Sequence, residues 1–385
     1  MATTTVAVAN EVSASQLKAA LELCFEVKQP VMIHGQPGIG KSQIIEGIAK
    51  ERNTAAGKEV VKVYDIRLSQ KEPTDLAGMP YFDSVTRRMM YAPPIDLPSA
   101  EEASQYETVI IFLDELTSAL PNTAAAAYQL VLDGKVGTYT LPDNAVVVAA
   151  GNRAGDKGVV YRMPSPLANR MTHFDLTVNF EDWMEWALNN GIHGDIVGYL
   201  KFSPSKLNTF DPSRPEHAFA TPRTWEFCSR ILKKGCNPST ERNIIAGTVG
   251  EGVMVEFMAH RSLTSGLPDV MDILNGEVTE FVIDNLSAQF SIGINSVLAL
   301  KPIYERAMAG EDESKKMAAY TMFDNIVGFL MGSTETEICV AIMRSAMVNS
   351  GIKIPAEVRG QCKNLVRFNQ SDAAKMLVAS IMKKQ

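Results

Sequence analysis

The segment "GQPGIGKS", from Gly35 to Ser42, directly follows the apolar run "PVMIHG", which has the composition of a buried strand. Glycine and proline weaken both helices and strands, so the segment is predicted to be a loop whose shape side chains would obstruct. A helix is predicted from Lys41 to Arg52, which places this loop between a strand and a helix. Glycines let successive backbone N–H groups point at anionic oxygens, and the helix adds the positive end of its dipole. The segment therefore predicts a phosphate-binding loop.

The spacing within this loop assigns roles to individual residues. The pattern Gly-x-x-x-x-Gly-Lys-Ser is complete as Gly35, Gly40, Lys41 and Ser42. Lys41 is expected to reach the β- and γ-phosphates, and Ser42 to ligate Mg²⁺. A chance match in a structural loop is the alternative, and the flanking strand and helix disfavour it. The expected cofactors are ATP and Mg²⁺, and the expected nucleotide-binding residues are Gly35, Gln36, Pro37, Gly38, Ile39, Gly40, Lys41, Ser42 and Gln43.

Polar residues follow two further apolar runs. "VIIFLDEL" ends in Asp114 and Glu115, at the carboxyl end of a predicted buried strand, where parallel sheets bind their ligands. Asp114 suits the Mg²⁺ shell, and Glu115 is suited to polarise an attacking water. Solvated acids at a strand end are the alternative. Asn152 ends "VVVAAGN" and is suited to orient that water, although a turn asparagine explains it equally well when it is considered alone.

Strands alternate with helices along the first half of the chain, which predicts a three-layer α/β/α core with a five-stranded parallel sheet. After this core the strand pattern fades and helical periodicity dominates. The expected organisation is a flexible N-terminus over 1–12, a nucleotide-binding core over 13–220 with an insertion at 69–98 and a hairpin at 134–143, a helical lid over 221–300 and a helical extension over 301–385.

The composition sets limits on the class of protein. Of the 385 residues, 46% are hydrophobic and 21% charged, as in ordinary globular proteins, and the net charge of −7 argues weakly against a general nucleic-acid binder. The five cysteines form no CxxC pair and are predicted to be reduced thiols, with neither a disulfide framework nor a metal site. The N-terminus lacks the features of a secretory signal, and no apolar run approaches the ~20 residues that span a bilayer. A cytoplasmic location is expected.

Taken together, these residues resemble an AAA+ ATPase, and more narrowly a MoxR-type member, over roughly Ser13 to Ala259. The phosphate loop is similar to the Walker A motif, "IIFLDE" to the Walker B motif, and Asn152 stands at the sensor 1 position. "SPLANRMTHFDL" resembles the family's arginine-finger segment and points to Arg170, while "TPRTWEF" resembles its sensor 2 helix and points to Arg223. The segments "DLAGMPYF" and "DGKVGTYTLPDN" resemble the family's insertion and its hairpin before sensor 1.

The resemblance implies an AAA+ P-loop NTPase fold and a catalytic group of Glu115, Asn152, Arg170 and Arg223. An arginine supplied in trans to a neighbour's γ-phosphate can contribute ~10³–10⁵ in rate, and Arg223 would sense the same phosphate in cis. Surface ion pairs are the alternative for both arginines. Arg153 and Arg162 lie close in sequence, so which of the three is the trans arginine stays open.

The expected function is ATP hydrolysis by a homo-oligomeric ring, expected to be a hexamer, that remodels or activates a partner protein. The resemblance implies chaperone-like action, often on a partner with a von Willebrand factor A domain. One alternative is a nucleic-acid motor whose hairpin carries Lys135, which the negative charge disfavours. The other is a nucleotide-gated scaffold with little turnover, which Glu115 and Asn152 disfavour. The partner, the ring size and the role of 301–385 stay open.

Overall fold

The computed structural model describes residues 10–156, 160–161, 163–214, 216–263 and 266–382. The chain divides into two compact units, each with its own internal contacts. The first unit takes in Met1–Asp182 and Phe210–Pro215, and the second takes in Trp183–Thr209 and Glu216–Gln385.

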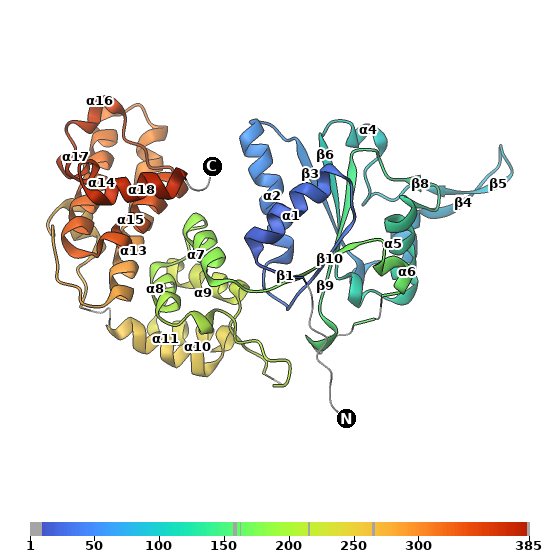
Figure 1. The fold of residues 1–385 in the computed structure, drawn as a ribbon, viewed down its shortest axis with the longest axis horizontal. Coiled ribbons are helices and arrows are strands. Elements are labelled where there is room, and N and C mark those ends of the chain that lie inside the picture. The colour runs from blue at the N-terminus through green and yellow to red at the C-terminus, as the bar shows by residue number, and fades with distance from the viewer. Residues whose placement is uncertain (1–9, 157–159, 162, 215, 264–265, 383–385) are drawn as a thin grey trace. The chain divides into compact units, whose positions relative to one another are not determined.

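The first unit contains a parallel sheet with the strand order β1-β10-β2-β9-β6-β3 (Figure 1). All its neighbouring strands are parallel, so their carboxyl ends meet at one edge. Because β9 lies between β2 and β6, the residue that follows β9 lies between the residues that follow the other two. The strands are β1 (Glu11–Val12), β2 (Val31–His34), β3 (Val61–Arg67), β6 (Thr108–Asp114), β9 (Ala145–Gly151) and β10 (Thr172–Leu176).

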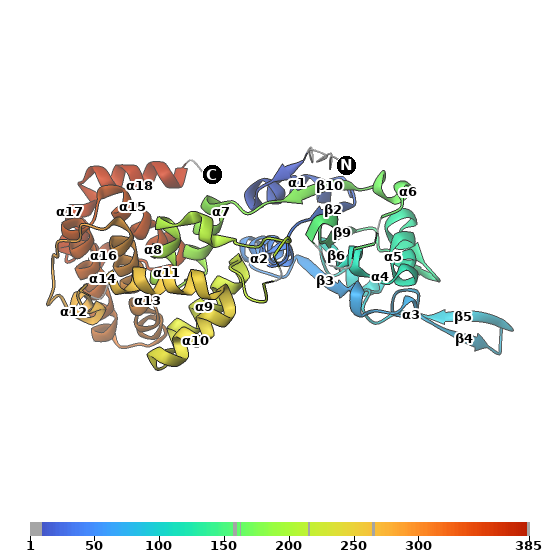
Figure 2. The ribbon, with the colours of Figure 1, turned by 90° about the horizontal axis from the view of Figure 1, so that it is seen from below.

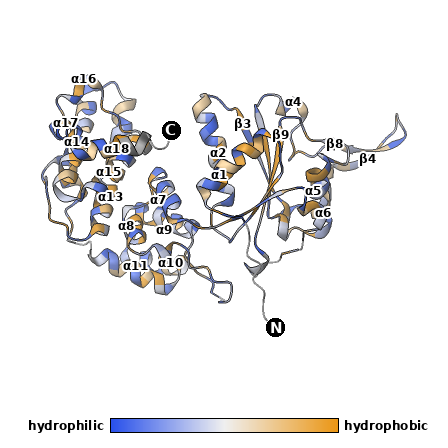
Figure 3. Cartoon of the chain, viewed as in Figure 1, coloured by the Kyte–Doolittle hydropathy of each residue, from blue (hydrophilic) through white to orange (hydrophobic). Residues whose placement is uncertain are grey.

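Helices cover both faces of this sheet, which makes three layers. On β6, Val109 and Ile111 belong to the hydrophobic cluster of helix α5 (Pro121–Asp133), while Ile110 belongs to that of α1 (Ala14–Glu26) and α2 (Lys41–Ala56). All three side chains are fully buried, and each stabilises the fold by about 1.5–3 kcal/mol. The central strands are accordingly hydrophobic along their length (Figure 3).

The predicted α/β class, its layered parallel core and the helical region that follows are confirmed, but the sheet has six strands and not five. The sixth is β1, where Glu11 pairs with Asp175 and Val12 with Leu176 at the free edge of β10. Residues 11 and 12 had been expected within a flexible N-terminus. A two-residue strand has no periodicity of its own, and the neighbouring backbone alone supplies its partners.

The segment between β3 and β6 carries an antiparallel hairpin that extends away from the rest of the first unit (Figures 1 and 2). A second hairpin after α5 packs against its base: Thr138 Oγ1 donates to Tyr91 O at 3.3 Å, and a Cβ at Gly137 would lie 2.6 Å from Ala77 O. The elements are η1 (Leu68–Gln70), α3 (Pro73–Ala77), β4 (Met79–Asp83), β5 (Arg88–Ala92), α4 (Ala100–Ala103), β7 (Lys135–Val136) and β8 (Tyr139–Thr140).

Among the described residues of the second unit, all regular secondary structure is helical, and the longest helix, α13, packs against α8 and α14. The half-buried Asp195 carboxylate on α8 accepts hydrogen bonds from Ser291 Oγ on α13 at 2.6 Å and from Arg261 Nε on α11 at 2.8 Å. The elements are α7 (Phe180–Asn189), α8 (Gly194–Phe202), η4 (Pro204–Leu207), α9 (Pro222–Lys234), α10 (Pro238–Val249), α11 (Glu251–Leu263), α12 (Val270–Asn275), α13 (Leu286–Ala309), α14 (Glu313–Ser333), α15 (Thr336–Arg344), η5 (Ser345–Asn349), α16 (Ala356–Arg359), α17 (Lys363–Asn369) and α18 (Asp372–Met382).

Among the described residues, no helix combines the length and the hydrophobicity that a membrane span requires.

Candidate functional site

The loop from Gly35 to Gly40 joins β2 to α2 by a path that only glycine permits at several points. Gly38 and Gly40 have φ angles of +76° and +94°, in the region that side chains disfavour. At Gly35 a Cβ would lie 2.7 Å from Ile39 Cδ1 and 3.1 Å from Leu176 O. Gly40 is the N-cap of α2 and has no side chain with which to cap it. The first turn of α2 therefore begins at a loop suited to an anion.

Lys41, the first residue of α2, points back into this loop. Its Nζ donates to Gly35 O at 2.7 Å, to Gln36 O at 3.0 Å and to Asn152 Oδ1 at 3.2 Å. Asn152 directly follows β9, so the last bond joins the phosphate loop to the neighbouring strand. The structure thus brings together two residues that the sequence placed 111 positions apart.

Ser42 connects the loop to the next strand along the sheet. Its Oγ donates to Asp114 Oδ2 at 3.1 Å, and Asp114 is the buried last residue of β6. A hydroxyl and a carboxylate are the hard oxygen ligands that Mg²⁺ prefers. Burial, and next the charge of Asp114, raises the pKa of the Asp65 carboxyl on β3. The carboxylates at this edge of the sheet thus make an electrostatic environment that favours a cation.

Glu115 has a backbone conformation that is rare for its type, with a φ angle of +58°. This left-handed conformation costs a non-glycine residue about 1–2 kcal/mol, and such strain collects at functional sites. Its carboxylate accepts a hydrogen bond from Ser69 Oγ, in η1 just beyond β3. Sequence analysis missed Ser69, because a serine in a Pro- and Gly-rich segment has no pattern that assigns it to a distant carboxylate.

Thr117 is a second residue that sequence analysis missed. It lies in η2 (Leu116–Ser118), is buried, and its Oγ1 accepts a hydrogen bond from Asn152 N at 3.1 Å. A Cβ at Gly151 would lie 2.4 Å from this hydroxyl oxygen, so the close approach depends on that glycine. Thr117 therefore fixes the backbone from which Asn152 reaches Lys41. Its position two residues after Glu115 was the only clue in the sequence.

The remaining predicted loop residues surround these contacts. Gln36 and Pro37 are half-buried at the start of the loop, and Ile39 packs against the hydrophobic cluster of α1 and α2. Gln43 lies exposed in the first turn of α2.

The predicted arginines have different surroundings. Arg170 lies between α6 (Ser165–Ala168) and β10, with 57% of its side chain exposed. Arg153, a rival for the trans role, forms an ion pair with the buried Asp175, and its Nη2 donates to Leu176 O at 2.9 Å. Arg162 lies outside the described residues. Arg223 is exposed in the first turn of α9, which belongs to the second unit.

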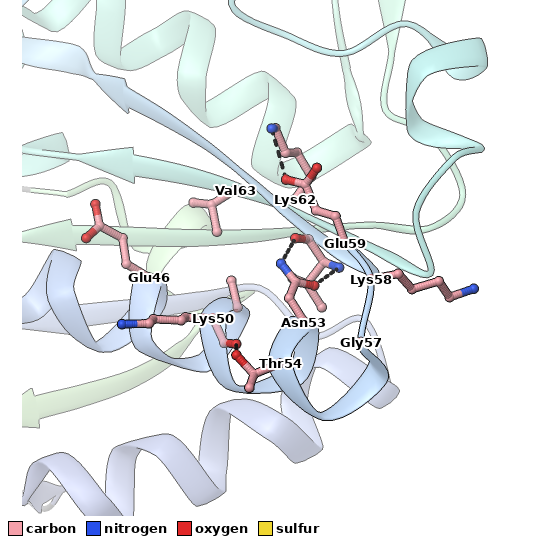
Figure 4. Close-up of a pocket in the computed structure, with 11 residues that line it drawn as sticks. Glu46, Lys50, Asn53, Thr54, Gly57, Lys58, Glu59, Lys62 and Val63 are labelled. Atoms are coloured by element: carbon pink, nitrogen blue, oxygen red, sulfur yellow. Dashed lines mark hydrogen bonds and ion pairs between the residues drawn. The ribbon is translucent and has the colours of Figure 1, made fainter. Parts of the chain in front are cut away.

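An open groove lies elsewhere in the first unit, between the C-terminal half of α2 and the start of β3 (Figure 4). Asn53 spans it: its Oδ1 accepts from Val60 N and Val61 N at 2.8 Å each, and its Nδ2 donates to Val61 O at 2.9 Å. The amide side chain thus bonds the helix to the strand. The residues that line this groove lie between Glu46 and Val63, so they do not include the phosphate loop.

The sequence matches no protein-family model and no curated protein sequence. Solved structures that resemble it include a candidate ATPase from Cytophaga hutchinsonii, at 13% identity and a TM-score of 0.34 over 93% of this chain and 90% of that one. RuvB of Thermotoga maritima, described as a Holliday junction branch migration motor, is 16% identical with a TM-score of 0.34 over 68% of this chain and 73% of its own. NtrX from Brucella abortus is 12% identical with a TM-score of 0.36, over 80% and 67%. At these TM-scores the similarities carry no argument about activity.

Proposed function

We propose that the chain is an ATP-hydrolysing AAA+ protein of MoxR type, which assembles into a hexameric ring and remodels or activates a partner protein. The observation that carries the proposal is the pair of contacts from the loop to two neighbouring strands, Lys41 to Asn152 and Ser42 to Asp114. These contacts place an ammonium, an amide, a hydroxyl and a carboxylate around one glycine-rich loop. A site that only bound phosphate would not require the acid pair at its edge.

Each of these residues has a role in hydrolysis. Lys41 Nζ would replace its hydrogen bonds to the loop carbonyls with hydrogen bonds to phosphate oxygens. Ser42 and Asp114 would hold Mg²⁺, which neutralises charge on the phosphates. Glu115 would orient the attacking water and accept its proton, with Ser69 holding the carboxylate in place. Asn152 would fix the water from the other side.

Arg170 is proposed to act on the nucleotide of a neighbouring subunit. It precedes β10, whose first residue, Thr172, pairs with Val31 at the start of β2. The phosphate loop follows the other end of β2, four residues or about 13 Å further along. The guanidinium therefore lies toward the edge of the sheet opposite its own loop, and its exposure leaves it accessible to another chain.

Steady-state ATPase assays with Mg²⁺ test the enzymatic part of the proposal. Glu115→Gln should lower kcat by about a hundredfold or more, the contribution expected of a general base, and should leave nucleotide affinity near that of the wild type. Lys41→Ala should abolish binding. A wild-type chain that binds ATP and does not hydrolyse it would refute the enzyme and leave a nucleotide-gated scaffold.

The Glu115→Gln variant also tests the remodelling part. It should hold ATP and retain its partner, which mass spectrometry of affinity-captured complexes would identify, with nuclease treatment as the control. A recurring protein, in particular one with a von Willebrand factor A domain, is the expected result. Recovery of nucleic acid without any protein would overturn the proposal in favour of a nucleic-acid motor.

A further inference from the structure

Two histidines lie between the phosphate loop and the turn that carries Arg170. His34 ends β2, directly before Gly35, and His173 is the second residue of β10. His34 Nε2 and His173 Nδ1 lie 3.0 Å apart, with the two rings within 11° of parallel. Burial, followed by the charges of His173, Arg153 and Lys41, lowers the pKa of His34 to about 4. His34 is therefore neutral at pH 7.

The hydrogen bonds of this pair extend to the end of α6. His173 Nε2 lies 2.8 Å from the carbonyl oxygen of Ala168, the last residue of α6. A carbonyl only accepts, so Nε2 of His173 carries the proton and donates it. The contact between His34 Nε2 and His173 Nδ1, in which one ring donates and the other accepts, joins this bond to the end of β2. An ordered chain of hydrogen bonds thus leads from the end of β2 to the end of α6.

The end of α6 is the turn that presents Arg170, and side chains hold its backbone on both sides. His173 binds the carbonyl of Ala168, two residues before Arg170, and Gln29 Nε2 donates to the carbonyl of Arg170 itself at 3.1 Å. The guanidinium contacts Asp133 at 3.9 Å, an exposed pair of little energetic value. The backbone at Arg170 is therefore fixed, whereas its charged group remains accessible.

We infer that His34, His173 and Gln29 are positioning residues for Arg170. They hold the backbone of its turn at a set place relative to the sheet, so that the guanidinium meets the phosphate of the adjacent subunit. The inference rests on the proposed function, because it requires Arg170 to act in trans. It adds that these three side chains serve the nucleotide site of the adjacent subunit, although His34 adjoins the phosphate loop of its own chain.

Complementation between inactive subunits tests this assignment. Glu115→Gln lacks the base and keeps Arg170, whereas Arg170→Ala keeps the base and lacks the arginine. Each variant alone should be inactive. In a 1:1 mixture, a site needs Glu115 from one chain and Arg170 from the next, so random assembly should restore about a quarter of the sites (½ × ½). If each variant alone is inactive and the 1:1 mixture restores no activity, the trans role is refuted, and with it the proposed function.

His173→Phe is then added to one partner at a time. In the Glu115→Gln chain, which supplies the arginine, it should lower the restored activity about tenfold or more, because misplacement by about 1 Å can cost about a hundredfold. In the Arg170→Ala chain, which has no arginine to position, the same substitution should leave the restored activity unchanged. General destabilisation would act equally in both chains. His173→Gln keeps an N–H donor for Ala168 and should restore part of the activity.

Gln29→Leu provides a second test at another half-buried position. It removes the hydrogen bond from Gln29 Nε2 to Arg170 O. Like His173→Phe, it should lower the restored activity in the Glu115→Gln chain and leave it unchanged in the Arg170→Ala chain. His217→Phe, at an exposed histidine of the second unit, is the matched control and should change nothing in either chain. Equal losses in both chains, or no loss in either, with the baseline intact, would overturn the inference and leave the proposed function standing.

Discussion

Substitution of Asn53 by alanine should destabilise the first unit and leave the chemistry of the phosphate loop intact. The side chain makes three hydrogen bonds, at 2.8, 2.8 and 2.9 Å, to the backbone at Val60 and Val61. Each such bond contributes about 1 kcal/mol net, and both valines are buried, so Asn53→Ala should lower the free energy of unfolding by about 2–3 kcal/mol. For a unit of this size that corresponds to about 5–10 °C in Tm.

The second unit serves as an internal reference for this measurement. All three tryptophans, Trp183, Trp186 and Trp225, belong to it, so tryptophan fluorescence follows its unfolding alone. Hydrogen exchange of peptides from β3 and β6 follows the first unit. Asn53→Ala should lower the protection of these peptides and leave the fluorescence transition where it is in the wild type.

Two matched variants make the estimate sharper. Asn53→Asp keeps the acceptor for the two N–H groups and loses the donor to Val61 O, so it should cost about 1 kcal/mol. Thr54→Ala removes only a hydroxyl that bonds the carbonyl of Lys50 within α2, and should change stability by less than about 0.5 kcal/mol. Equal stability of Asn53→Ala and Thr54→Ala would refute the reasoning.

Three further predictions concern the candidate site. Ser69→Ala removes the hydrogen bond to the Glu115 carboxylate and should lower kcat with little effect on KM. An unchanged kcat would contradict the role assigned to Ser69. Thr117→Val should lower kcat about fivefold, the value of one hydrogen bond to Asn152 N, as steady-state assays would show. Because the pKa of His34 is lower in the folded chain than in the unfolded chain, the unfolded chain binds a proton at this residue at a higher pH. The stability of the first unit should therefore fall as the pH drops from about 6.5 to about 4, and His34→Gln should flatten this part of the chemical-denaturation profile.

The elements that sequence analysis predicted are those that local patterns define. The continuous apolar run of β6 predicts a strand that is buried on both faces, and Val109 to Leu113 are buried as expected. Serine is a favoured helix cap, and Ser13 is the N-cap of α1 with a capping box to Gln16. In both cases the residues that determine the structure lie within a few positions of one another.

The contacts that escaped prediction join segments far apart in the chain. Ser69 meets Glu115 across 46 positions, and Thr117 meets Asn152 across 35. Serine and threonine are common at turns and helix caps, so their identity alone does not distinguish a positioning role from a local one. Only the parallel sheet, which aligns the carboxyl ends of β3, β6 and β9, brings these hydroxyls to the site.

The rival arginines show what a side chain's surroundings add to its position in sequence. Arg153 neutralises Asp175, which is 7% exposed, and removal of one partner of such a pair leaves an uncompensated buried charge at a cost of about 3–5 kcal/mol. The same guanidinium cannot leave Asp175 for a neighbouring phosphate without that cost. Among the described residues, the acidic partner of the Arg170 side chain is the exposed Asp133, and the loss of such an exposed pair costs little free energy. Of these two arginines, Arg170 is therefore the better suited to the proposed trans role. This distinction depends on contacts with residues 22 and 37 positions away, and hence on the folded chain.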